Sequence, residues 1–389
     1  MAMPMPSEPV STVTSKTIAS ANTCSATPPD HAPAPTLTID VGAVVANWRL
    51  LCARHTGETA AVVKADAYGL GAALIAPALA AAGCRRFFVA TTDEAFALRR
   101  TLPAAWIAVL NGCPPGLEAD ALAHNISPVL NSLADCARWQ AAARKSGRRP
   151  SALLHIDTGM SRLGLDAAEC ATLLAEPGRL DGINLNYIMT HLVAAEDPNA
   201  LSNQRQAAHF AAIAARFPGI GTSITNSSGI FLGPNFATDL ARPGIALYGG
   251  NPTPHAPNPM RPVITLSAPI LQIRAINAGD TVGYNASWRA GRPSLIATIG
   301  VGYADGLPRS LAGRLTARHH DRVIPLVGRV SMDLMTFDIT DNPDLTQGTP
   351  LELIGPGHDI DAIAAEAGTI PYEILTSLGR RYRRVVKSV

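Results

Sequence analysis

Long apolar stretches, an excess of one charge and patterned cysteines are all missing from this chain. No apolar run reaches the roughly 18–20 residues that a membrane-spanning helix needs, and one of the longest, residues 72–83, contains Pro77. The 32 basic and 30 acidic residues leave a net charge of +2, which excludes an electrostatic footprint for nucleic acid or an anionic membrane. The six cysteines have neither CxxC nor metal-ligand spacing, so we expect no metal site and reduced thiols in a cytoplasmic protein.

Charged residues are also scarce, at 16% of the chain, whereas hydrophobic residues make up 47%. This balance supplies a large core and excludes wholesale disorder. A length of 389 residues exceeds one small domain and fits two domains, or a barrel with an appended domain.

The N-terminal segment, residues 1–35, is rich in Pro, Ser, Thr and Ala and has no hydrophobic periodicity, which predicts a disordered tail. It has no basic start followed by an apolar core, so we expect no secretory signal. Order is predicted to begin at TLTID (36–40), a short alternating strand. Asp40 then has the position of an N-cap for a helix with apolar residues from Val44 to Leu51.

A repeating alternation of apolar runs and helical patterns begins at residue 60. The predicted strands are AAVV (60–63), FFVA (87–90), WIAVL (106–110), SPVL (127–130), ALLHI (152–156), INLNYIMT (183–190), TSIT (222–225) and a weaker eighth near FATDLAR (236–242). Helical patterns separate them, at residues 74–82, 93–100, 116–123, 133–145, 167–174 and 201–216. Eight such units in about 190 residues are typical of an N-terminal (β/α)8 TIM barrel, which we assign to residues 36–262. A doubly wound open sheet is the alternative, but no GxGxxG follows the first strand.

After residue 262 the apolar runs recur without long helical patterns between them. These runs cover residues 265–276, 294–304, 323–340 and 350–355, and turn signals such as AGD (278–280), AGR (290–292) and DNPD (341–344) separate them. We therefore predict a mostly β second domain over residues 263–389, within a chain of the α/β class. The Pro-rich stretch NPTPHAPNP (251–259) has the composition of a linker or loop.

Polar residues gather directly after the predicted barrel strands, although they are far apart in the sequence. Lys64 follows the first run, DTGMSR (157–162) the fifth, His191 the sixth, Asn226 and Ser227 the seventh, and RPG (242–244) the eighth. The C-terminal ends of barrel strands build the active site of such folds, so we expect these five segments to share one cavity.

Each of these residues also has an interpretation without catalysis. Lys64, in VVKADAYGLG, is either a side chain that reaches the surface from a strand end, or a desolvated, neutral amine that forms a Schiff base. Arg162 forms either a surface salt bridge or a guanidinium clamp for a substrate carboxylate. His191 by itself is more typical of a packed core histidine than of a catalytic one.

The remaining motifs are equally open when each is taken alone. Asn226 and Ser227, before Gly229, fit a phosphate-binding helix start as well as an ordinary N-cap. The glycine in RPGI (242–245) permits a close backbone approach to a ligand, or simply a turn. In the second domain, GYADG (302–306) fits an aromatic packed at a turn, and GRRYRR (379–384) fits a solvated charge run.

Together and in this order, the motifs resemble those of the alanine racemase family, which uses pyridoxal 5′-phosphate (PLP). The matching segments are VVKADAYGLG (62–71), DTGMSRLG (157–164), His191, TNSSG (225–229), RPGIALYG (242–249), GYADGLPR (302–309), GRVSMD (328–333) and RRYR (380–383). They cover nearly everything past the tail. The resemblance implies a barrel with a β domain, a homodimer with two sites at its interface, and an isomerase that interconverts L- and D-alanine. Such an enzyme supplies D-alanine for cell-wall peptidoglycan.

The resemblance also implies which residues act on the substrate. Lys64 would hold PLP covalently and act as the base on one face of the substrate. Tyr303, contributed across the dimer interface, would act on the opposite face. Arg162 and the backbone N–H of Met332 would bind the substrate carboxylate.

A second group of residues would hold the cofactor, by the same resemblance. His191 would lie against the pyridine ring, and Arg242 would contact the ring nitrogen. Around the phosphate we expect Tyr68, Asn226, Ser227, Gly244, Ile245 and Tyr382.

Racemisation explains why two separate proton carriers are needed. A single base would return the proton to the face it left, so Lys64 and Tyr303 must lie on opposite sides of the α-carbon. A tyrosine with an ordinary pKa of about 10 is a poor base. Our hypothesis is that His191 and Arg242 lower the pKa of Tyr303 through a hydrogen-bonded relay. A charged Arg242 would also keep the pyridine nitrogen unprotonated, which suits a racemase because it suppresses transamination.

One position departs from the family pattern. Many members carry a carbamylated Lys seven residues before the motif Arg, and its negative charge orients that Arg. Here the position is His155, which cannot take the same role. We therefore predict a small bound anion, or another side chain, beside Arg162.

Three other functions stay open on the sequence alone. A broad-specificity amino-acid racemase shares the fold and both bases and differs in pocket size. A fold-related PLP decarboxylase needs a carboxylate at the pyridine nitrogen and a phosphate-binding loop with consecutive glycines, whereas this chain has Arg242 and no GGG. A non-catalytic PLP carrier resembles the barrel alone, which leaves the second domain and Tyr303 without a purpose.

Overall fold

The computed structural model describes residues 34–387. Strand β1 (Thr36–Asp40) comes first, and helix α1 (Val41–Arg54) follows it directly. Asp40 Oδ1 accepts a hydrogen bond from the backbone N–H of Ala43 at 2.7 Å, which confirms the predicted N-cap. The predicted disordered tail lies outside the described residues, except for its last two.

Seven parallel strands form the first sheet, in the same order in space as in the sequence. They are β3 (Ala61–Val62), β4 (Arg86–Val89), β5 (Trp106–Val109), β6 (Ile126–Leu130), β7 (Ser151–His155), β8 (Asn184–Met189) and β9 (Gly221–Ser223). Most of their side chains are buried, because both faces of the sheet are covered. The strands are therefore continuously apolar instead of alternating, and this is why apolar runs predicted them.

The weak eighth strand closes the barrel. Strand β10 (Leu240–Ala241) pairs in parallel with β2 (Glu58–Thr59), which leads through Ala60 into β3. Backbone hydrogen bonds extend the contact on both sides, from Val62 N to Pro243 O at 3.0 Å and from Arg242 N to Thr225 O at 2.8 Å. The predicted TIM-like barrel is thereby confirmed.

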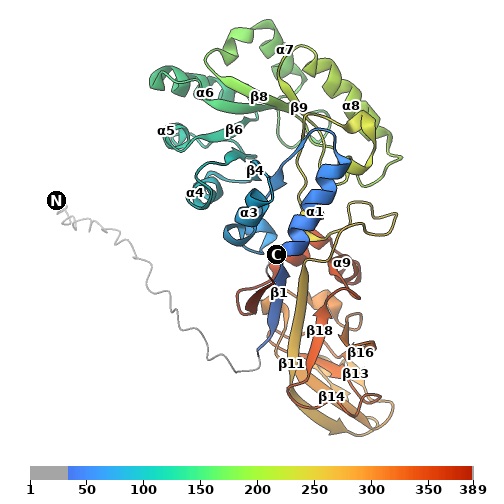
Figure 1. Ribbon diagram of the computed structural model, residues 1–389. Helices are drawn as coiled ribbons and strands as arrows, with labels where there is room; N and C mark the ends of the chain where they lie inside the picture. The colour runs from blue at the N-terminus through green and yellow to red at the C-terminus, as the bar shows by residue number, and fades with distance from the viewer. Residues whose placement is uncertain (1–33, 388–389) are drawn as a thin grey trace, which may run out of the picture. The chain divides into compact units, whose positions relative to one another are not determined.

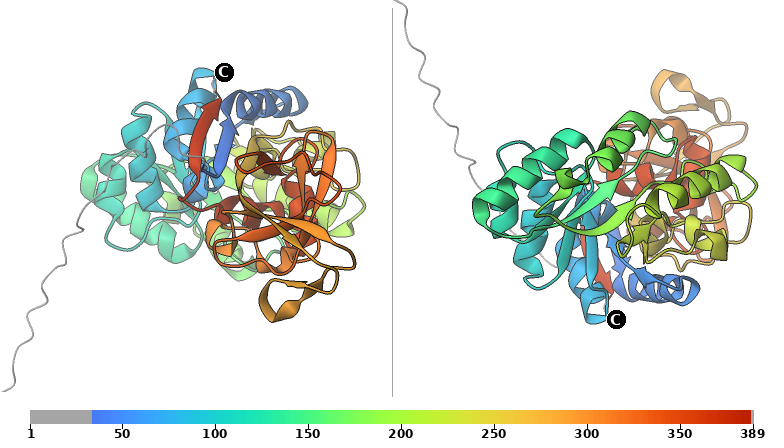
Figure 2. Two further views of the ribbon diagram at one scale, coloured as in Figure 1. Left: turned by 90° about the horizontal axis from the view of Figure 1, so that it is seen from below. Right: turned by 90° about the horizontal axis from the view of Figure 1, so that it is seen from above.

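Helices lie around the outside of these strands (Figure 1, Figure 2). They are α3 (Ala72–Ala81), α4 (Thr92–Thr101), α5 (Glu118–Ala123), α6 (Leu133–Ser146), α7 (Ala167–Ala175) and α8 (Leu201–Ala214). A short helical turn, α2 (Lys64–Tyr68), precedes them. Helix α4 begins with a capping box, in which the Thr91 hydroxyl accepts from Glu94 N and the Glu94 carboxylate accepts from Thr91 N.

The second domain is built on an eight-stranded sheet with the order β14-β17-β16-β15-β18-β11-β1-β19. Its strands after β1 are β11 (Ile264–Ile276), β14 (Ser294–Ile299), β15 (Thr316–His319), β16 (Arg322–Val327), β17 (Met335–Asp338), β18 (Pro350–Ile354) and β19 (Arg383–Lys387). Strand β14 also pairs with β11, so part of the sheet closes on itself. A small hairpin, β12 (Thr281–Val282) with β13 (Trp288–Arg289), stands apart from it.

Three features of this domain differ from the sequence-based expectation. The apolar run at 323–340 is two strands, β16 and β17, with a turn between them. Two helices, α9 (Ile360–Ala367) and α10 (Pro371–Ser377), were not expected in a mostly β region. Strand β1, which we assigned to the barrel, is hydrogen-bonded to β11 and β19 of the second sheet instead.

Residues 34–387 contain neither a membrane-spanning helix nor a cluster of metal ligands. No helix there is long and apolar enough to cross a membrane. No group of three or more His, Cys, Asp or Glu side chains there is arranged to hold a metal ion.

Candidate active site

A cavity of about 470 Å³ lies at the C-terminal ends of the barrel strands. The predicted barrel residues gather in its lining, which includes Lys64, Tyr68, Arg162, His191, Asn226, Ser227, Arg242, Gly244 and Ile245. Five distant segments therefore meet at one place, as the positions after the strands predicted. Within residues 34–387, no Asp or Glu side chain lines this cavity. The cavity thus combines two arginines and a lysine with no carboxylate from the described residues, which suits ligands that carry negative charge.

Lys64 is held at the start of an unusual backbone turn. The next four residues, Ala65 to Tyr68, have φ values of 52–56°, the left-handed region that non-glycine residues rarely adopt. The Glu94 carboxylate fixes the turn from outside, since it accepts from Ala65 N and from Ala90 N at 2.7 Å each. Asp66 Oδ1 accepts from Ala72 N, also at 2.7 Å. These bonds offset the cost of a conformation that orients the Lys64 side chain.

The surroundings of Lys64 favour its neutral amine. Burial is the main cause that lowers the pKa of Lys64, and the nearby charge of Arg162 lowers it further. The Glu94 carboxylate acts in the opposite direction, with a smaller effect. A neutral amine is the form that acts as a nucleophile or accepts a proton.

Arg242 is buried among neutral partners. Its guanidinium donates to Ser223 Oγ and, at 2.6 Å, to the backbone carbonyl of Thr190. Burial lowers the pKa of Arg242 to about 10, so the side chain stays protonated at neutral pH. A charged donor therefore faces the cavity without a carboxylate beside it.

The two histidines of the cavity are neutral. Burial and the charges of Arg242 and Arg162 lower the pKa of His191 to about 3. The same causes lower the pKa of His155 to about 4, where burial is again the largest. Neither imidazole adds positive charge at physiological pH.

The tautomer of His155 follows from its neighbour Asn131. Asn131 Nδ2 donates to the carbonyls of Leu110 and Val129, at 3.2 Å each, so its Oδ1 is the acceptor that faces His155. The distance from His155 Nδ1 to Asn131 Oδ1 is 2.8 Å. His155 Nδ1 therefore carries the hydrogen, and Nε2 keeps an acceptor lone pair.

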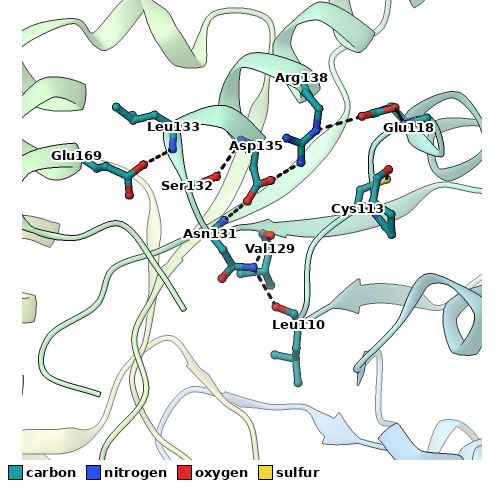
Figure 3. A network of polar contacts seen from close by, with 12 residues as sticks. Leu110, Cys113, Glu118, Val129, Asn131, Ser132, Leu133, Asp135, Arg138 and Glu169 are labelled. Carbon is teal, nitrogen blue, oxygen red and sulfur yellow. Dashed lines mark hydrogen bonds and ion pairs between the residues drawn. The ribbon is translucent and has the colours of Figure 1, made fainter. Parts of the chain in front are cut away.

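A wider polar network holds Asn131 in this orientation (Figure 3). The Asp135 carboxylate accepts from Asn131 N at 2.9 Å and pairs with Arg138. Arg138 Nε lies 3.3 Å from Glu118 Oε1, which links the network to helix α5. The carboxylates of this network keep Asn131 in place from outside the cavity.

Arg162 stands on a loop whose backbone is fixed. The Asp157 carboxylate accepts hydrogen bonds from the backbone N–H groups of Gly159, Met160 and Ser161, at 2.8–2.9 Å. The Arg162 side chain is exposed and, within residues 34–387, forms no hydrogen bond or ion pair. Because His155 is neutral, it supplies no negative charge to Arg162. The anion or side chain expected there stays a prediction.

A cradle suited to a phosphate lies at the barrel end near Gly244. Ser227 Oγ accepts from Gly244 N at 2.9 Å and from Ala246 N at 3.3 Å. A Cβ on Gly244 would lie 2.1 Å from Tyr68 Oη, so only glycine permits the tyrosine hydroxyl to reach this place. Hydroxyl groups and cationic side chains without a carboxylate fit the phosphate and ring of PLP.

Tyr303 and Met332 do not line the cavity of their own chain. Both are exposed, by 42% and 53%, on two adjacent turns of the second domain. Tyr303 N donates to Ser331 O at 3.0 Å, and a Cβ on Gly302 would lie 2.4 Å from Met332 O. The two turns are thus locked together, and they present Tyr303 and Met332 on one surface.

Two family models match this chain across both domains. The model of the alanine racemase N-terminal domain covers residues 39–252, and that of the C-terminal domain covers residues 263–386. The chain belongs to the alanine racemase family. The resemblance in the sequence is therefore confirmed, and with it the enzyme class, an isomerase.

Similar proteins support the same assignment to the alanine racemases. The alanine racemase of Acidiphilium cryptum is 70% identical over 355 residues, which are 91% of this chain and 99% of that protein. A catabolic alanine racemase of Agrobacterium fabrum is 50% identical over 352 residues, 90% of this chain and 91% of the relative. The alanine racemase structure from Bartonella henselae, with covalently bound pyridoxal phosphate, is 44% identical with a TM-score of 0.88, and covers 92% of this chain and 100% of that one.

Two tyrosines near the C-terminus have positions that the family resemblance did not predict. Tyr382 does not line the cavity; it is buried, and its hydroxyl has no hydrogen-bond partner within the described residues. Tyr372, on helix α10, lines the cavity instead, with its ring centroid 5.9 Å from that of Tyr68. Sequence reasoning missed Tyr372 because helix α10 itself was not predicted. Asn111, another lining residue that we missed, follows strand β5 just as Lys64 follows β3, so that position was available as a signal.

Proposed function

We propose that this chain interconverts L- and D-alanine with PLP as cofactor, as a homodimer in which each site takes Tyr303 from the other copy. The cavity supports this proposal through its lysine and two arginines, its two neutral histidines and its lack of carboxylates in the described part of the chain. The exposed Tyr303, outside the cavity of its own chain, supports the contribution from a second copy.

The residues that would hold PLP divide between its reactive end and its phosphate. The amine of Lys64, whose pKa burial lowers, would attach it covalently, and the cradle of Tyr68, Ser227 and Gly244 would take the phosphate. When bound, PLP supplies an electron sink for the electron pair that a removed proton leaves on the substrate α-carbon. Arg242 would donate to the ring nitrogen, because its protonated guanidinium cannot accept a hydrogen bond there.

Two proton carriers would act on opposite faces of the α-carbon. The Lys64 amine accepts or returns the proton on one face, and the Tyr303 hydroxyl of the second copy does so on the other. Each positioned carrier contributes about 10²–10⁴-fold in rate. Arg162 and the backbone N–H of Met332 would bind the carboxylate, so that the α-carbon stays between the two carriers.

The observation that carries the proposal is the amine of Lys64 in one cavity with Arg162 and Arg242, which no carboxylate of residues 34–387 lines. The test is a panel of L-amino acids, each incubated with the purified, PLP-loaded protein and analysed for its D-enantiomer. We expect D-alanine to form faster than any other enantiomer. Loss of D-alanine formation in Lys64→Ala is expected, whereas an active Lys64→Ala would refute the role of this amine. Comparable rates with large side chains would favour a broad-specificity racemase.

Tyr303 needs a direction-specific test. Tyr303→Phe should keep PLP bound and impair proton removal from L-alanine in a single turnover. A wild-type rate of deuterium exchange from L-alanine in that variant would exclude Tyr303 as the base.

The biological role we propose is the supply of D-alanine for peptidoglycan in the cytoplasm. Expression in a bacterial strain that lacks its own racemases, and therefore requires D-alanine, tests this role. Growth without D-alanine by the wild-type gene, and not by Lys64→Ala, is the expected result. Failure of both genes to support growth, with the active protein present in the cells, would contradict it.

A further inference from the structure

A single buried amide joins the two loops that carry Arg162 and His191. Gln206 lies on helix α8, and only 3% of its surface is exposed. Its Nε2 donates to Thr158 Oγ1 at 3.0 Å and to the backbone carbonyl of His191 at 2.9 Å. Its Oε1 accepts from Val193 N at 3.0 Å. Both N–H donors and the oxygen of this side chain are therefore used.

The contacts of Gln206 continue to the buried arginine of the cavity. Thr158 Oγ1 lies 2.7 Å from Thr190 Oγ1, and the carbonyl of Thr190 accepts from Arg242 at 2.6 Å. Thr158 belongs to the loop that ends in Arg162, and Thr190 directly precedes His191. One connected set of hydrogen bonds thus relates the helix to the segments of Arg162, His191 and Arg242.

A neighbouring side chain on the same helix provides a contrast. Asn203, three residues earlier and also buried, donates to the carbonyls of Ala194 and Asp197, at 3.1 and 2.9 Å. It holds the loop after His191 but does not contact the loop of Arg162. Of these two amides, Gln206 alone contacts both loops, and it binds the same Thr158 hydroxyl that meets Thr190, so the relative position of the loops depends on this pair of contacts.

We infer that Gln206 is a positioning residue, which sets the Arg162 loop and the His191 loop at the spacing that alanine binding requires. This inference rests on the proposed function, because Arg162 is taken as the carboxylate clamp. Gln206 itself contacts neither substrate nor cofactor. Its loss would leave the Thr158–Thr190 contact as the remaining side-chain link described above and let the two loops shift, and displacements of about 1 Å at such a site cost up to 10²-fold in rate.

The experiment compares Gln206→Leu with Gln140→Leu in the PLP-loaded enzyme. Leucine has a similar size and no polar atom, so it removes all three hydrogen bonds. Gln140, on helix α6, donates to the carbonyls of Gly178 and Asp181 away from the cavity, and is the matched control. We expect the KM for L-alanine to rise about tenfold or more in Gln206→Leu and to stay within twofold of wild type in Gln140→Leu.

Amide hydrogen exchange supplies a readout besides activity. Exchange at Val193 N, and in the backbone from Thr158 to Arg162, should accelerate in Gln206→Leu and not in Gln140→Leu. Asn203→Leu should accelerate exchange after His191 only and leave the KM near that of wild type. An unchanged KM in Gln206→Leu, with or without faster exchange or a lower Tm, would overturn the inference.

Gln206→Glu covers the case in which Gln206→Leu does not fold. It retains an acceptor for Val193 N and loses the donors to Thr158 and to the His191 carbonyl. We expect a raised KM in this variant, and an unchanged KM would again overturn the inference. A wild-type protein without racemase activity would refute the proposed function instead, while the exchange data still report whether Gln206 joins the two loops.

Discussion

At the scale of single residues, burial lowers the pKa of several basic side chains in the cavity. Burial lowers the pKa of both Lys64 and Arg242, and Arg242, with a pKa of about 10, stays protonated at neutral pH. His155 and His191 are neutral, so they add no repulsion to these cations. The positive charge of the site therefore does not come from its histidines, and the site favours anionic ligands.

The neutral histidines predict how stability depends on pH. In the unfolded chain both imidazoles titrate at about 6.5, whereas their folded pKa values are about 3 and about 4. Below pH 6.5 the unfolded chain binds more protons than the folded one. The stability contributed by the neutral rings is thus fully present above this pH and is lost as the pH falls toward 4. The Tm of the PLP-free protein should fall steadily between pH 7 and pH 4.5.

His155→Gln should reduce this fall, because one titrating group is removed, and exposed His255→Gln is the control. Equal pH dependence of the Tm in His155→Gln and in wild type would contradict the assignment of a neutral His155. Nitrogen NMR of the histidine rings would show the Nδ1–H tautomer of His155 directly.

Gly244 is the residue whose replacement we expect to damage the phosphate cradle most cleanly. In Gly244→Ala the new methyl group would meet Tyr68 Oη at 2.1 Å, which forces the tyrosine or the backbone to move. We expect the Kd for PLP to rise by at least about tenfold, since each tenfold change needs only about 1.4 kcal/mol. Equilibrium dialysis of PLP against the purified variant measures it.

Tyr68→Phe, added to Gly244→Ala, removes the atom in closest contact and should recover part of the affinity. Gly291→Ala, where nothing lies within 4 Å of the new methyl group, is the control. If Gly244→Ala binds PLP as tightly as Gly291→Ala does, the phosphate lies elsewhere.

The cavity residues of the barrel could be predicted because each of them follows a strand, and an apolar run in the sequence indicates that strand. Lys64, His191 and Arg242 all satisfy this rule. Tyr372 does not, since it enters the cavity from the second domain, and no local pattern relates residue 372 to the barrel. Tyr382 shows the limit of a motif: the RRYR segment was recognised, but the side chain of its tyrosine lies inside the protein.

At the scale of elements, the left-handed turn after β3 depends on a carboxylate from another helix. Glu94 accepts from Ala65 N and Ala90 N and also completes the N-terminal cap of α4. Glu94→Ala should lower the free energy of unfolding by about 1–2 kcal/mol, because Ala65 N and Ala90 N lose their partner and helix α4 loses part of its N-terminal cap. Chemical denaturation measures the difference.

Asp93→Ala, at an exposed position in the same helical turn, is the matched control and should change stability much less. Glu94→Ala should also weaken PLP binding, because the turn orients Lys64. A variant that is destabilised but binds PLP with wild-type affinity would show that the turn does not depend on Glu94 for its geometry.

Elements were predicted well where a periodic pattern acts locally. The parallel strands are buried on both faces, and helices α4, α6 and α7 begin at side-chain caps, so these elements are visible in the sequence. The neighbouring strands of β1 could not be predicted, because the alternation of polar and apolar residues in TLTID fits any strand with one buried face. Helices α9 and α10 were missed because the expectation of a β domain outweighed a local helical pattern that begins at Asp359.

At the scale of the whole molecule, the second domain of the same chain reaches the barrel cavity. Tyr372 lines the cavity, and Arg384 donates to the backbone carbonyl of Gly69 at 2.8 Å. Helix α10 therefore lies against the turn that follows Lys64. Tyr303, in contrast, does not line this cavity, and our proposal requires a second copy to bring it to the α-carbon.

Mixed dimers test this arrangement directly. Lys64→Ala and Tyr303→Phe are each expected to be inactive alone. If Lys64 and Tyr303 of one site come from different copies, random mixing gives one intact site in half of the dimers, or about a quarter of wild-type activity. Assays after unfolding and refolding an equal mixture measure this recovery.

The double variant Lys64→Ala, Tyr303→Phe mixed with wild type is the matched control for dilution, since it carries the same two changes in one chain. No recovery of activity from the mixture of single variants, with dimers present, would refute a site shared between copies.

Strand β1 and strand β19 lie next to each other, although 342 residues separate Asp40 from Arg383. During translation β1 leaves the ribosome before the barrel and β19 after nearly everything else. One edge of β1 must therefore wait unpaired while the rest of the protein is synthesised, and its β11 partner arrives only after the barrel segments. Strand β19 then completes the sheet that supports the start of helix α1, so a chain that stalls or is released before β19 is left with an open edge at which chaperones, or other nascent chains, can bind.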